Sequence, residues 1–482
     1  MGNTEFYPIF KTSKKITLVN PNFMNPILEA INHVISLYNE YVGGYLILIL
    51  LVPTGIFFTV KYRFLQVSHF RHALRLVGGK YSKKDETGDV SHFKALTTAL
   101  SGTVGTGNIV GVSLAIYLGG PGAIFWIWVT GFFGMMLKMV ECTLAQIFRK
   151  VNADGSISGG PMYYIEIGLK DKLGRFAKPL ALIFAGAAAL CTLGTGNMAQ
   201  ANSISDVLLT SYNVPVLATG IGLALLVLLI IVGGLKRIAN VTSTLVPFMA
   251  ALYFISAIIV IGVHWRDIPS AFGLIISDAF TGTAAAGGFV GSTFIMTLVW
   301  GVRRGLFSNE AGQGSAPMAH AAAKTEHPMR EGFVASLEPL VDTIIICTLT
   351  ALVVVISGAW TSGIQGVGMT IEGFQEGMSK VGMGYFAVHV VTLGLLLFAF
   401  STIISWSYYG SRAIQYIFSD KAIKPFYFVF ALFTFFGAIW GIDLVWNFVD
   451  MVITFMTIPN LIALLLLAPV MTKEVKRYKD FL

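Results

Sequence analysis

Two stretches of small and polar residues interrupt long hydrophobic segments of the chain. Residues 101–111 read Ser-Gly-Thr-Val-Gly-Thr-Gly-Asn-Ile-Val-Gly, and residues 299–315 are interrupted by Gly305, Gly312 and Gly314. Glycine costs a helix interior about 1 kcal/mol relative to alanine, and asparagine favours caps and turns. We therefore expect the helix to break at each stretch. In a bilayer an unwound segment must be buried in protein or line a cavity. A cavity that holds a small charged ligand and a cation would satisfy the freed N–H and C=O groups.

The chemistry that two broken helices suit is recognition of an α-amino acid. Such a molecule is a zwitterion, and each of its ends needs a partner when it leaves water. Backbone N–H groups at half-helix N-termini can face the carboxylate, while carbonyl ends and side-chain amides take the ammonium group. On this basis the candidates are Thr106, Gly107 and Asn108 at the first break, with Phe307 and Ser308 at the second.

The glycines also have a plainer explanation, which is that small residues let membrane helices pack closely. Packing alone does not need polar or charged side chains, which are expensive in lipid. Several such side chains lie in or beside the two stretches: Asn108, Arg303, Arg304, Asn309 and Glu310. We therefore favour a ligand site over simple packing.

Membrane-spanning helices are the elements that must position these residues. The chain has 482 residues, of which 55% are hydrophobic and 12% are charged, compared with about 25% charged residues in soluble domains. Segments of about 20 apolar residues are long enough to cross a bilayer. Eleven candidates follow one another along the chain, at residues 41–60, 92–118, 122–148, 177–208, 213–234, 238–263, 288–323, 332–357, 384–416, 424–440 and 442–470. The sequence therefore predicts an all-α polytopic membrane protein with 11 transmembrane helices in the lipid bilayer.

The basic residues indicate how the chain is oriented. The net charge is +8, but the Lys and Arg residues lie in short loops and do not form the basic stripe of a nucleic-acid-binding surface. With the N-terminus outside, 25 Lys and Arg fall in inner loops or adjoining span ends and 5 in outer loops. By the positive-inside rule we expect an outside N-terminus, a cytoplasmic C-terminus, and no nucleic acid as a partner.

The two interrupted spans are the second and the seventh candidates, which places them at corresponding positions of two five-helix halves. Paired Gly-interrupted segments of this kind are typical of inverted-repeat secondary transporters with a site near the midplane. We expect five regions in chain order: an extracellular segment at 1–40 with an interfacial helix at 25–38, an extra helix at 41–62, repeats at 91–263 and 286–470, and a basic cytoplasmic tail at 471–482.

Three motifs resemble those of a known family. Residues 119–134, Gly-Gly-Pro-Gly-Ala-Ile-Phe-Trp-Ile-Trp-Val-Thr-Gly-Phe-Phe-Gly, resemble the signature of the alanine/glycine:cation symporters (sodium:alanine symporters), with Ile127 where the usual form has methionine. Residues 105–111 and 307–312 also look like motifs of that family, and the resemblance covers about residues 41–480. It implies the leucine-transporter-like fold, with one extra N-terminal helix, two inverted five-helix repeats and two broken helices.

The resemblance also implies residues that line the substrate pocket. By similarity these are Asn108, Gln200, Phe307 and Trp406. Gln200 follows a second Gly-Thr-Gly-Asn sequence at 194–197, and it could instead make an interhelical hydrogen bond worth about 0.6 kcal/mol. Trp406 could be an aromatic-belt anchor, but it lies well inside its span.

A sodium ion is the cofactor that the family implies. By resemblance it would be held by the hydroxyl groups of Ser401 and Thr402, with carbonyl groups near Gly102 and Gly105. The alternative for a serine or threonine in a membrane helix is a hydrogen bond to its own i−4 carbonyl. Without the resemblance that alternative would be favoured.

The expected function is import of L-alanine, D-alanine or glycine with sodium, by alternating access, across the inner membrane of a prokaryotic cell, for which a monomer is sufficient. No enzyme activity is expected, because the sequence lacks His-Glu-x-x-His, Gly-x-Ser-x-Gly and P-loop motifs. A proton-coupled symporter stays open, because Glu338, Asp342 and Asp450 lie inside candidate spans. A cation channel is a further alternative. Lys138 and Glu141, one helical turn apart, are expected to pair.

Overall fold

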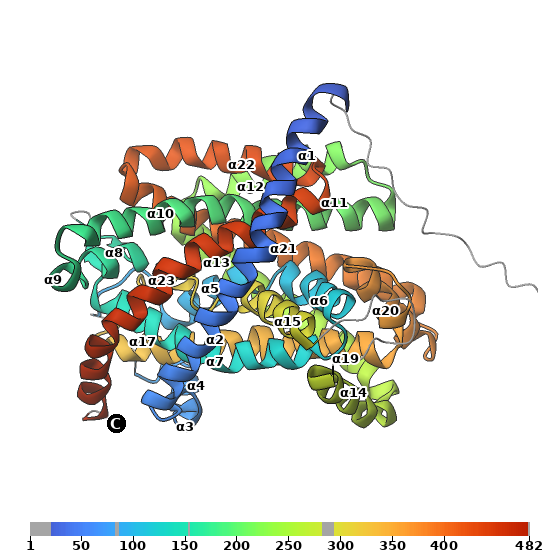
Figure 1. Cartoon of the computed structure of the whole chain (residues 1–482), viewed down its shortest axis with the longest axis horizontal. Helices are drawn as coiled ribbons and strands as arrows, with labels where there is room; N and C mark the ends of the chain where they lie inside the picture. Colours follow the sequence, from blue (N-terminus) through green and yellow to red (C-terminus); the bar gives the residue numbers. More distant parts are fainter. Residues whose placement is uncertain (1–20, 82–85, 153–154, 282–293, 481–482) are drawn as a thin grey trace, which may run out of the picture.

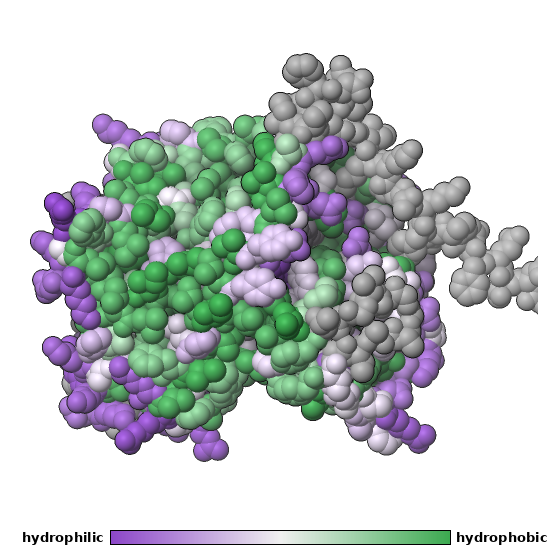
Figure 2. All heavy atoms as spheres, viewed as in Figure 1, coloured by the Kyte–Doolittle hydropathy of each residue, from purple (hydrophilic) through white to green (hydrophobic). Residues whose placement is uncertain are grey.

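The computed structural model describes residues 21–81, 86–152, 155–281 and 294–480, and this part of the chain is almost entirely helical. Long helices lie side by side along the longest axis of the molecule (Figure 1). Hydrophobic side chains cover the middle of the visible face, and hydrophilic ones gather toward the two ends of that axis (Figure 2). This distribution is that of a multi-pass membrane protein whose helices cross the apolar layer.

The first part of the chain forms an N-terminal helix, short surface helices, a broken helix and several spans. Its short hairpin pairs β1 (Lys150–Val151) with β2 (Ile157–Ser158) antiparallel. The helices in chain order are α1 Pro21–Tyr38, η1 Asn39–Gly43, α2 Gly44–Lys61, α3 Leu65–Ser68, α4 Phe70–Val77, α5 His92–Thr103, η2 Gly107–Gly111, α6 Val112–Gly119, α7 Ala123–Ile147, α8 Pro161–Glu166, α9 Lys170–Leu173, η3 Gly174–Phe176, α10 Ala177–Leu193, η4 Gly194–Met198, α11 Ala199–Tyr212, α12 Val216–Ile231 and α13 Gly234–Val263.

The second part contains another broken helix and four further long helices. In chain order its helices are η5 Trp265–Asp267, α14 Ile268–Thr281, α15 Phe294–Asn309, α16 Ala316–His320, α17 Pro328–Ala335, α18 Leu337–Pro339, η6 Leu340–Cys347, α19 Thr348–Ile356, η7 Ala359–Thr361, α20 Val367–Ser379, α21 Gly384–Ile417, η8 Asp420–Ala422, α22 Ile423–Ile439 and α23 Ile442–Lys479.

Fewer helices than eleven are long and apolar enough to cross a membrane unaided. Among the described residues there are 8, or 9 when α5 and α6 count as one bent span. The remaining candidates are α12, which has 16 residues, and the segment 288–323, whose described part is divided between α15 and α16. Residues 288–293 lie outside the described part. The prediction of a helical membrane protein is confirmed, whereas the count of 11 and the inverted repeats stay predictions.

Both predicted breaks are present. α5 ends at Thr103, Val104 is extended with φ −73° and ψ 93°, and the helix resumes as the π-helical turn η2, with a bend of 49° between the two halves. α15 ends at Asn309, and φ is positive at Glu310 (55°), Gly312 (80°) and Gly314 (86°). Glycine adopts positive φ at little cost, which is why the second break falls in this sequence.

The two ends of the bundle differ in charge. One end carries α3, α4, α9 and the end of α23 (Figure 1). We call it the basic face, because the loops at 62–91 and 149–176 and the C-terminal tail at 471–482 together contain 15 of the 33 Lys and Arg residues. The opposite end carries α20 (Figure 1), and we call it the α20 face. α5, α17 and the chain after α16 belong to the basic-face half.

The first and last long helices are neighbours along much of their length. α1 begins at Pro21 and joins α2 through η1, so the residues expected to form an interfacial helix continue into the first span. Asn39 Nδ2 donates to the carbonyl of Asn447 at 2.8 Å, and Tyr62 Oη donates to the carbonyl of Ala468 at 3.1 Å. α1 and α2 therefore pack against α23 from its beginning to its last third.

Candidate functional site

The two breaks meet at the side chain of Asn108, which is fully buried. Its Oδ1 accepts a hydrogen bond from the backbone N–H of Gly105 at 2.9 Å, which fixes the unwound turn. Its Nδ2 donates to Ser308 Oγ at 3.2 Å and to Asp342 Oδ1 at 2.7 Å. One amide therefore holds the first break open and ties it to the second break and to η6.

Asp342 is the acidic centre of this cluster. Its Oδ2 accepts hydrogen bonds from Ser308 Oγ at 2.6 Å and Thr343 Oγ1 at 2.7 Å, in addition to the Asn108 contact on Oδ1. The residue is 0% exposed, and all three of these donors are neutral. A buried carboxylate without a cationic partner is costly, so this position suits either a proton or a cationic ligand.

Gln200 and Thr106 form the second polar contact of the first break. The backbone N–H of Thr106 donates to Gln200 Oε1 at 3.1 Å, and Gln200 Nε2 donates to the carbonyl of Thr195 at 3.1 Å. The interhelical bond considered for Gln200 is thus formed. The Oγ1 atom of Thr106 is buried and has no hydrogen-bond partner in the described part of the chain. A buried hydroxyl without a partner costs free energy, so it points to a ligand at the break.

Phe307 and Trp406 lie on different sides of the broken helices. The Phe307 ring packs 5.0 Å from the ring of Trp446, and a Cβ on Gly107 would lie 3.1 Å from Phe307 Cδ1. Trp406 is fully buried and donates its indole N–H to Glu310 Oε1 at 2.9 Å, with the Gly102 carbonyl 3.3 Å away. Both aromatic side chains therefore contact the breaks, and neither lies in an aromatic belt.

A compact set of oxygen atoms surrounds the hydroxyl of Thr402. Its Oγ1 lies 3.0 Å from the carbonyl of Ser101, 3.3 Å from that of Val104 and 3.1 Å from that of Phe398. Phe398 supplies the i−4 carbonyl of the same helix, so the contact considered as the alternative for Thr402 is also present. The Oγ of Ser401 also lies 2.9 Å from the Phe398 carbonyl. Three carbonyl and two hydroxyl oxygens from α5, the first break and α21 thus converge, which is the ligand chemistry that hard cations prefer.

The carbonyl groups in this set stand one residue before those proposed from the sequence. Ser101 and Val104 contribute them, whereas the carbonyl of Gly102 accepts from Trp406 and that of Gly105 accepts from the backbone N–H of Asn108 at 3.3 Å. Gly105 still matters for the geometry, because a Cβ there would lie 2.6 Å from Thr402 Oγ1. Its missing side chain lets α21 approach the break.

An ion pair lies beside Phe307 on the second broken helix. Arg304 Nη2 lies 2.6 Å from Asp450 Oδ2, and the guanidinium group stacks over the rings of Trp446 (5.0 Å) and Trp300 (5.4 Å). Arg304 precedes Phe307 on α15, and its guanidinium group lies 5.9 Å from the Phe307 ring. The stacked pair therefore covers one side of Phe307.

Lys138 and Glu141 of α7 both find their partners on neighbouring segments of the chain. Lys138 Nζ bonds to Glu338 Oε2 at 3.0 Å, so the expected pair with Glu141 is wrong. Glu141 instead accepts from the backbone N–H of Gly312 and from Asn460 Nδ2, each at 2.9 Å. Local spacing suggested a same-helix pair, but a partner from a neighbouring helix lies closer.

All seven residues predicted for the substrate are buried and lie at the two breaks or in direct contact with them: Thr106, Gly107, Asn108, Gln200, Phe307, Ser308 and Trp406. The sequence did not identify Asp342 as the partner of Asn108. The only signal was an acidic residue inside an apolar segment, and that signal applied equally to Glu338 and Asp450.

The sequence is similar to those of known transporters over nearly its whole length. Residues 28–482 match the family described as the sodium:alanine symporter family. The sodium/alanine symporter AgcS of Methanococcus maripaludis is 42% identical over 450 residues, covering 92% of this chain and 97% of that protein. The putative sodium/proton-dependent alanine carrier YrbD of Bacillus subtilis is 36% identical, covering 90% of this chain and 89% of the relative. The probable sodium/glutamine symporter GlnT of the same organism is 35% identical, covering 94% and 91%.

The fold also has a solved counterpart. The crystal structure of MhsT in complex with L-phenylalanine aligns with a TM-score of 0.57 at 15% sequence identity, and the alignment covers 79% of this chain and 89% of that one. At this level of identity the likeness concerns the fold alone, which is the leucine-transporter-like fold expected from the sequence.

Proposed function

Because this chain belongs to the sodium:alanine symporter family, we propose that it imports a small neutral amino acid, alanine (L or D) or glycine, driven by a sodium gradient. The single observation that carries the proposal is the convergence of two broken helices on one buried polar cluster around Asn108, beside an oxygen cage around Thr402. A zwitterion and a hard cation are the ligands that these two adjoining environments suit.

The proposed amino-acid site lies at the first break. The unpaired hydroxyl of Thr106 and the backbone of Gly107 and Asn108 lie between Gln200 and Phe307. Backbone N–H groups at this turn would face the substrate carboxylate, and the carboxylate of Asp342 would attract its ammonium group. Phe307 and Trp406 are bulky, and as walls of the substrate pocket they would leave room for a short side chain only, which favours alanine or glycine over larger amino acids.

Sodium would occupy the cage formed by the carbonyls of Ser101, Val104 and Phe398 and the hydroxyls of Ser401 and Thr402. The carbonyls of Ser101 and Val104 are available there because α5 ends at Thr103, between these two residues. A cation in this cage would tie the first broken helix to α21. This gives a physical reason for coupling, because the same break also contacts the amino acid.

Transport would proceed by alternating access between the two faces. We assign the basic face to the cytoplasm from the distribution of Lys and Arg, which places the N-terminus outside and the C-terminus inside a prokaryotic inner membrane. The Arg304–Asp450 pair would then be the external closure. One chain contains the whole cluster, so a monomer suffices for the proposed mechanism.

Proton coupling is the second candidate, and Asp342 is the observation in its favour. This buried carboxylate has only neutral donors around it, and an intramembrane acid can carry a coupling proton. One relative bears a name that includes sodium and proton dependence. A cation channel built from the broken helices is the third and weaker candidate.

The deciding experiment is uptake of radiolabelled alanine into proteoliposomes that contain the purified protein. A sodium gradient imposed at equal pH should drive accumulation that saturates with alanine, and a proton gradient imposed without sodium should not. Accumulation driven by the proton gradient alone would favour the Asp342 mechanism. Ion currents that persist without alanine and do not saturate would favour a channel.

A further inference from the structure

Five ionisable side chains form an unbroken line of contacts inside the basic-face half of the molecule. Glu331 contacts the Nδ1 atoms of His92 and His320, and the His320 contact is 2.5 Å long. The other ring nitrogen of His320, Nε2, lies 2.5 Å from Glu338 Oε1, and Glu338 Oε2 bonds to Lys138 Nζ at 3.0 Å. All five side chains are at most 2% exposed.

This line joins helices from both breaks. His92 is the first residue of α5, the basic-face half of the first broken helix, and His320 is the last residue of α16, which follows the second break. Glu331 and Glu338 lie on α17 and α18, and Lys138 lies on α7. Buried charges are expensive to desolvate, and none of these contacts belongs to the proposed amino-acid or sodium sites. Their cost therefore requires a separate explanation.

The protonation of His320 follows from its contacts. Ionised carboxylates only accept hydrogen bonds, and a neutral imidazole has one N–H and one bare nitrogen. Both ring nitrogens of His320 contact carboxylate oxygens. The ring is therefore doubly protonated, or one of the two carboxyl groups carries the proton. In both cases Glu331, His320 and Glu338 together carry two protons, one more than a neutral imidazole ring with two ionised carboxylates.

His92 differs from His320 in this respect. It contacts only Glu331, and its Nε2 has no hydrogen-bond partner in the described part of the chain. A neutral ring with its proton on Nδ1 satisfies that arrangement. The extra proton therefore belongs to the group formed by Glu331, His320 and Glu338, which we call the carboxylate–histidine triad.

We propose that the carboxylate–histidine triad is a proton-binding site that locks the cytoplasmic end of the two broken helices, and that release of its one proton to cytoplasmic water unlocks that end. With the proton bound, both ring-nitrogen contacts of His320 are hydrogen bonds, whichever of the three groups carries the proton, and through Glu331 they hold the start of α5 at His92. Without it, one of the two carboxylates faces a bare ring nitrogen, and the two negative charges repel across the ring.

Other titratable and charged groups lie on the elements packed against the triad. They are Glu86 and His92 from α5 and the segment before it, Lys138, Glu141, Cys142 and Arg149 from α7 and the residues after it, Glu310 from the second break, Tyr409 from α21, and His72 and Tyr478 from α4 and α23 beyond α17. Lys138 is paired with Glu338, and Arg149 donates to the carbonyls of Ala321 and Ala323. Of these groups and the members of the triad, His320 is the residue whose side chain contacts two carboxylates.

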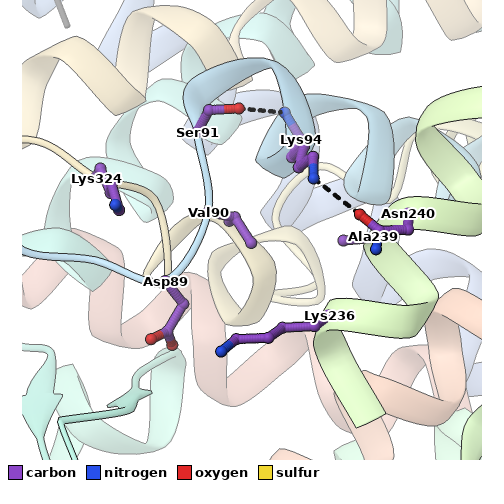
Figure 3. A pocket seen from close by; sticks show the side chains of 8 residues that line it. All are labelled: Asp89, Val90, Ser91, Lys94, Lys236, Ala239, Asn240 and Lys324. Carbon is purple, nitrogen blue, oxygen red and sulfur yellow. Dashed lines mark hydrogen bonds between the residues drawn. The ribbon is translucent and has the colours of Figure 1, made fainter. Parts of the chain in front are cut away.

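The start of α5, which would move when the triad loses its proton, lies beside a cavity of about 360 Å³ on the basic face. Figure 3 shows Lys94 of α5 reaching Asn240 of α13, with Lys236 and Lys324 around the same space; the Lys94 Nζ to Asn240 Oδ1 distance is 2.8 Å. Ala239 lines this cavity but is only 1% exposed. Its exposure to water should therefore rise when α5 moves away from α13.

The test is the rate at which a maleimide labels Ala239→Cys in the purified full chain between about pH 6 and about pH 9, a range that brackets the ordinary histidine pKa of about 6.5. The unmodified chain, whose three cysteines are buried, gives the blank. Thiol ionisation itself changes with pH, so each rate is divided by the rate of Ala239→Cys in a His320→Leu background at the same pH. A leucine side chain has no hydrogen-bond donor, so it cannot hold the two carboxylates together and that background should be unlocked throughout.

We expect the ratio to be about tenfold below one at the acidic end, which corresponds to about 1.4 kcal/mol of locking, and to rise toward one at the alkaline end. The rise should extend well above the ordinary histidine range, because two carboxylates favour the protonated ring. Glu338→Gln should instead keep the triad locked at every pH. Its amide can donate to a neutral His320 and accept from Lys138, so the lock needs no extra proton. Labelling in that background should stay slow across the range once thiol ionisation is allowed for.

His327→Gln is the matched control, because it removes a histidine close to Tyr478 on the same face and outside the triad. It should keep the pH dependence of the unsubstituted triad. A ratio that does not change with pH, a Glu338→Gln protein that keeps the dependence, or a His327→Gln protein that loses it would each overturn the proposal. The measurement needs no transport, so its outcome is separate from that of the alanine uptake experiment.

Discussion

Trp406 donates its indole N–H to the carboxylate of Glu310 at 2.9 Å. Because the carbonyl of Gly102 is also 3.3 Å from the same nitrogen, one side chain of α21 contacts both broken helices. Gly196 of η4 makes this possible, since a Cβ there would overlap the indole ring. The position of Trp406 is therefore set from three sides, which is what a wall of a small binding site requires.

We expect Trp406→Ala to widen the range of amino acids that bind. Removing the indole would open space beside Gly102, and leucine should then compete with labelled alanine, which it should not do in the unmodified protein. Trp406→Phe keeps an aromatic wall and serves as the control, in which leucine should still be excluded. Exclusion of leucine by a well-folded Trp406→Ala protein would mean that the wall lies elsewhere.

Thr402→Ala should weaken sodium dependence while leaving the substrate contacts in place. The substitution removes one of five oxygen atoms from the proposed cage. We expect the half-saturating sodium concentration for alanine uptake to rise about tenfold, which corresponds to about 1.4 kcal/mol. Thr402→Ser retains the hydroxyl and should behave like the unmodified protein. An unchanged sodium requirement in Thr402→Ala would argue against this cage.

Asn108→Leu should abolish alanine binding without preventing insertion. The change removes the hydrogen bond that fixes Gly105 and the donors to Ser308 and Asp342, while insertion depends on hydrophobicity and flanking basic residues. Equilibrium binding of labelled alanine, with size-exclusion chromatography as a check of folding, measures the effect. Unmodified affinity in a monodisperse Asn108→Leu protein would show that the break is a packing feature.

Asp342→Asn separates the two coupling ions. The amide preserves the shape of the carboxylate and its oxygen can still accept from Ser308 and Thr343, but its NH₂ group cannot accept from Asn108 and cannot carry a coupling proton. If sodium in the Thr402 cage drives transport, sodium-driven uptake should persist at an alanine affinity reduced by about tenfold, because the ammonium group loses an opposite charge. Loss of all gradient-driven uptake, with alanine binding retained, would favour the proton-coupled mechanism.

The breaks were predictable because their cause is local. Glycine and asparagine act on the helix that contains them, so the segments at 101–111 and 299–315 could be identified from composition and spacing. Gly107 is a glycine whose role depends on packing and not on its backbone. It is not among the glycines with positive φ; the space for a side chain there is limited by Phe307 and Ser308, each with an atom 3.1 Å from the Cβ position.

The partners across the site were not predictable, because they depend on packing between distant segments. Asn108 and Asp342 are 234 residues apart in the chain, and nothing near Asp342 in the sequence selects it over Glu338. The carbonyl groups of Ser101 and Val104 depend on the rotational phase of α5 against α21, which a sequence pattern specifies to within about one residue at best. Lys138 shows the same limit, since its partner Glu338 comes from a different helix.

The contact between the first and last long helices has a consequence for how the protein is made. Tyr62, which directly follows α2, and its acceptor Ala468 are 406 residues apart. A ribosome that adds roughly 5–20 residues per second needs about 20–80 seconds to produce the second after the first. During that interval α2 is already made, but α23, the helix against which it packs, has not yet been synthesised. Completion of the bundle therefore waits for the final helix, and truncation near the C-terminus should leave the beginning of the chain exposed to membrane quality control.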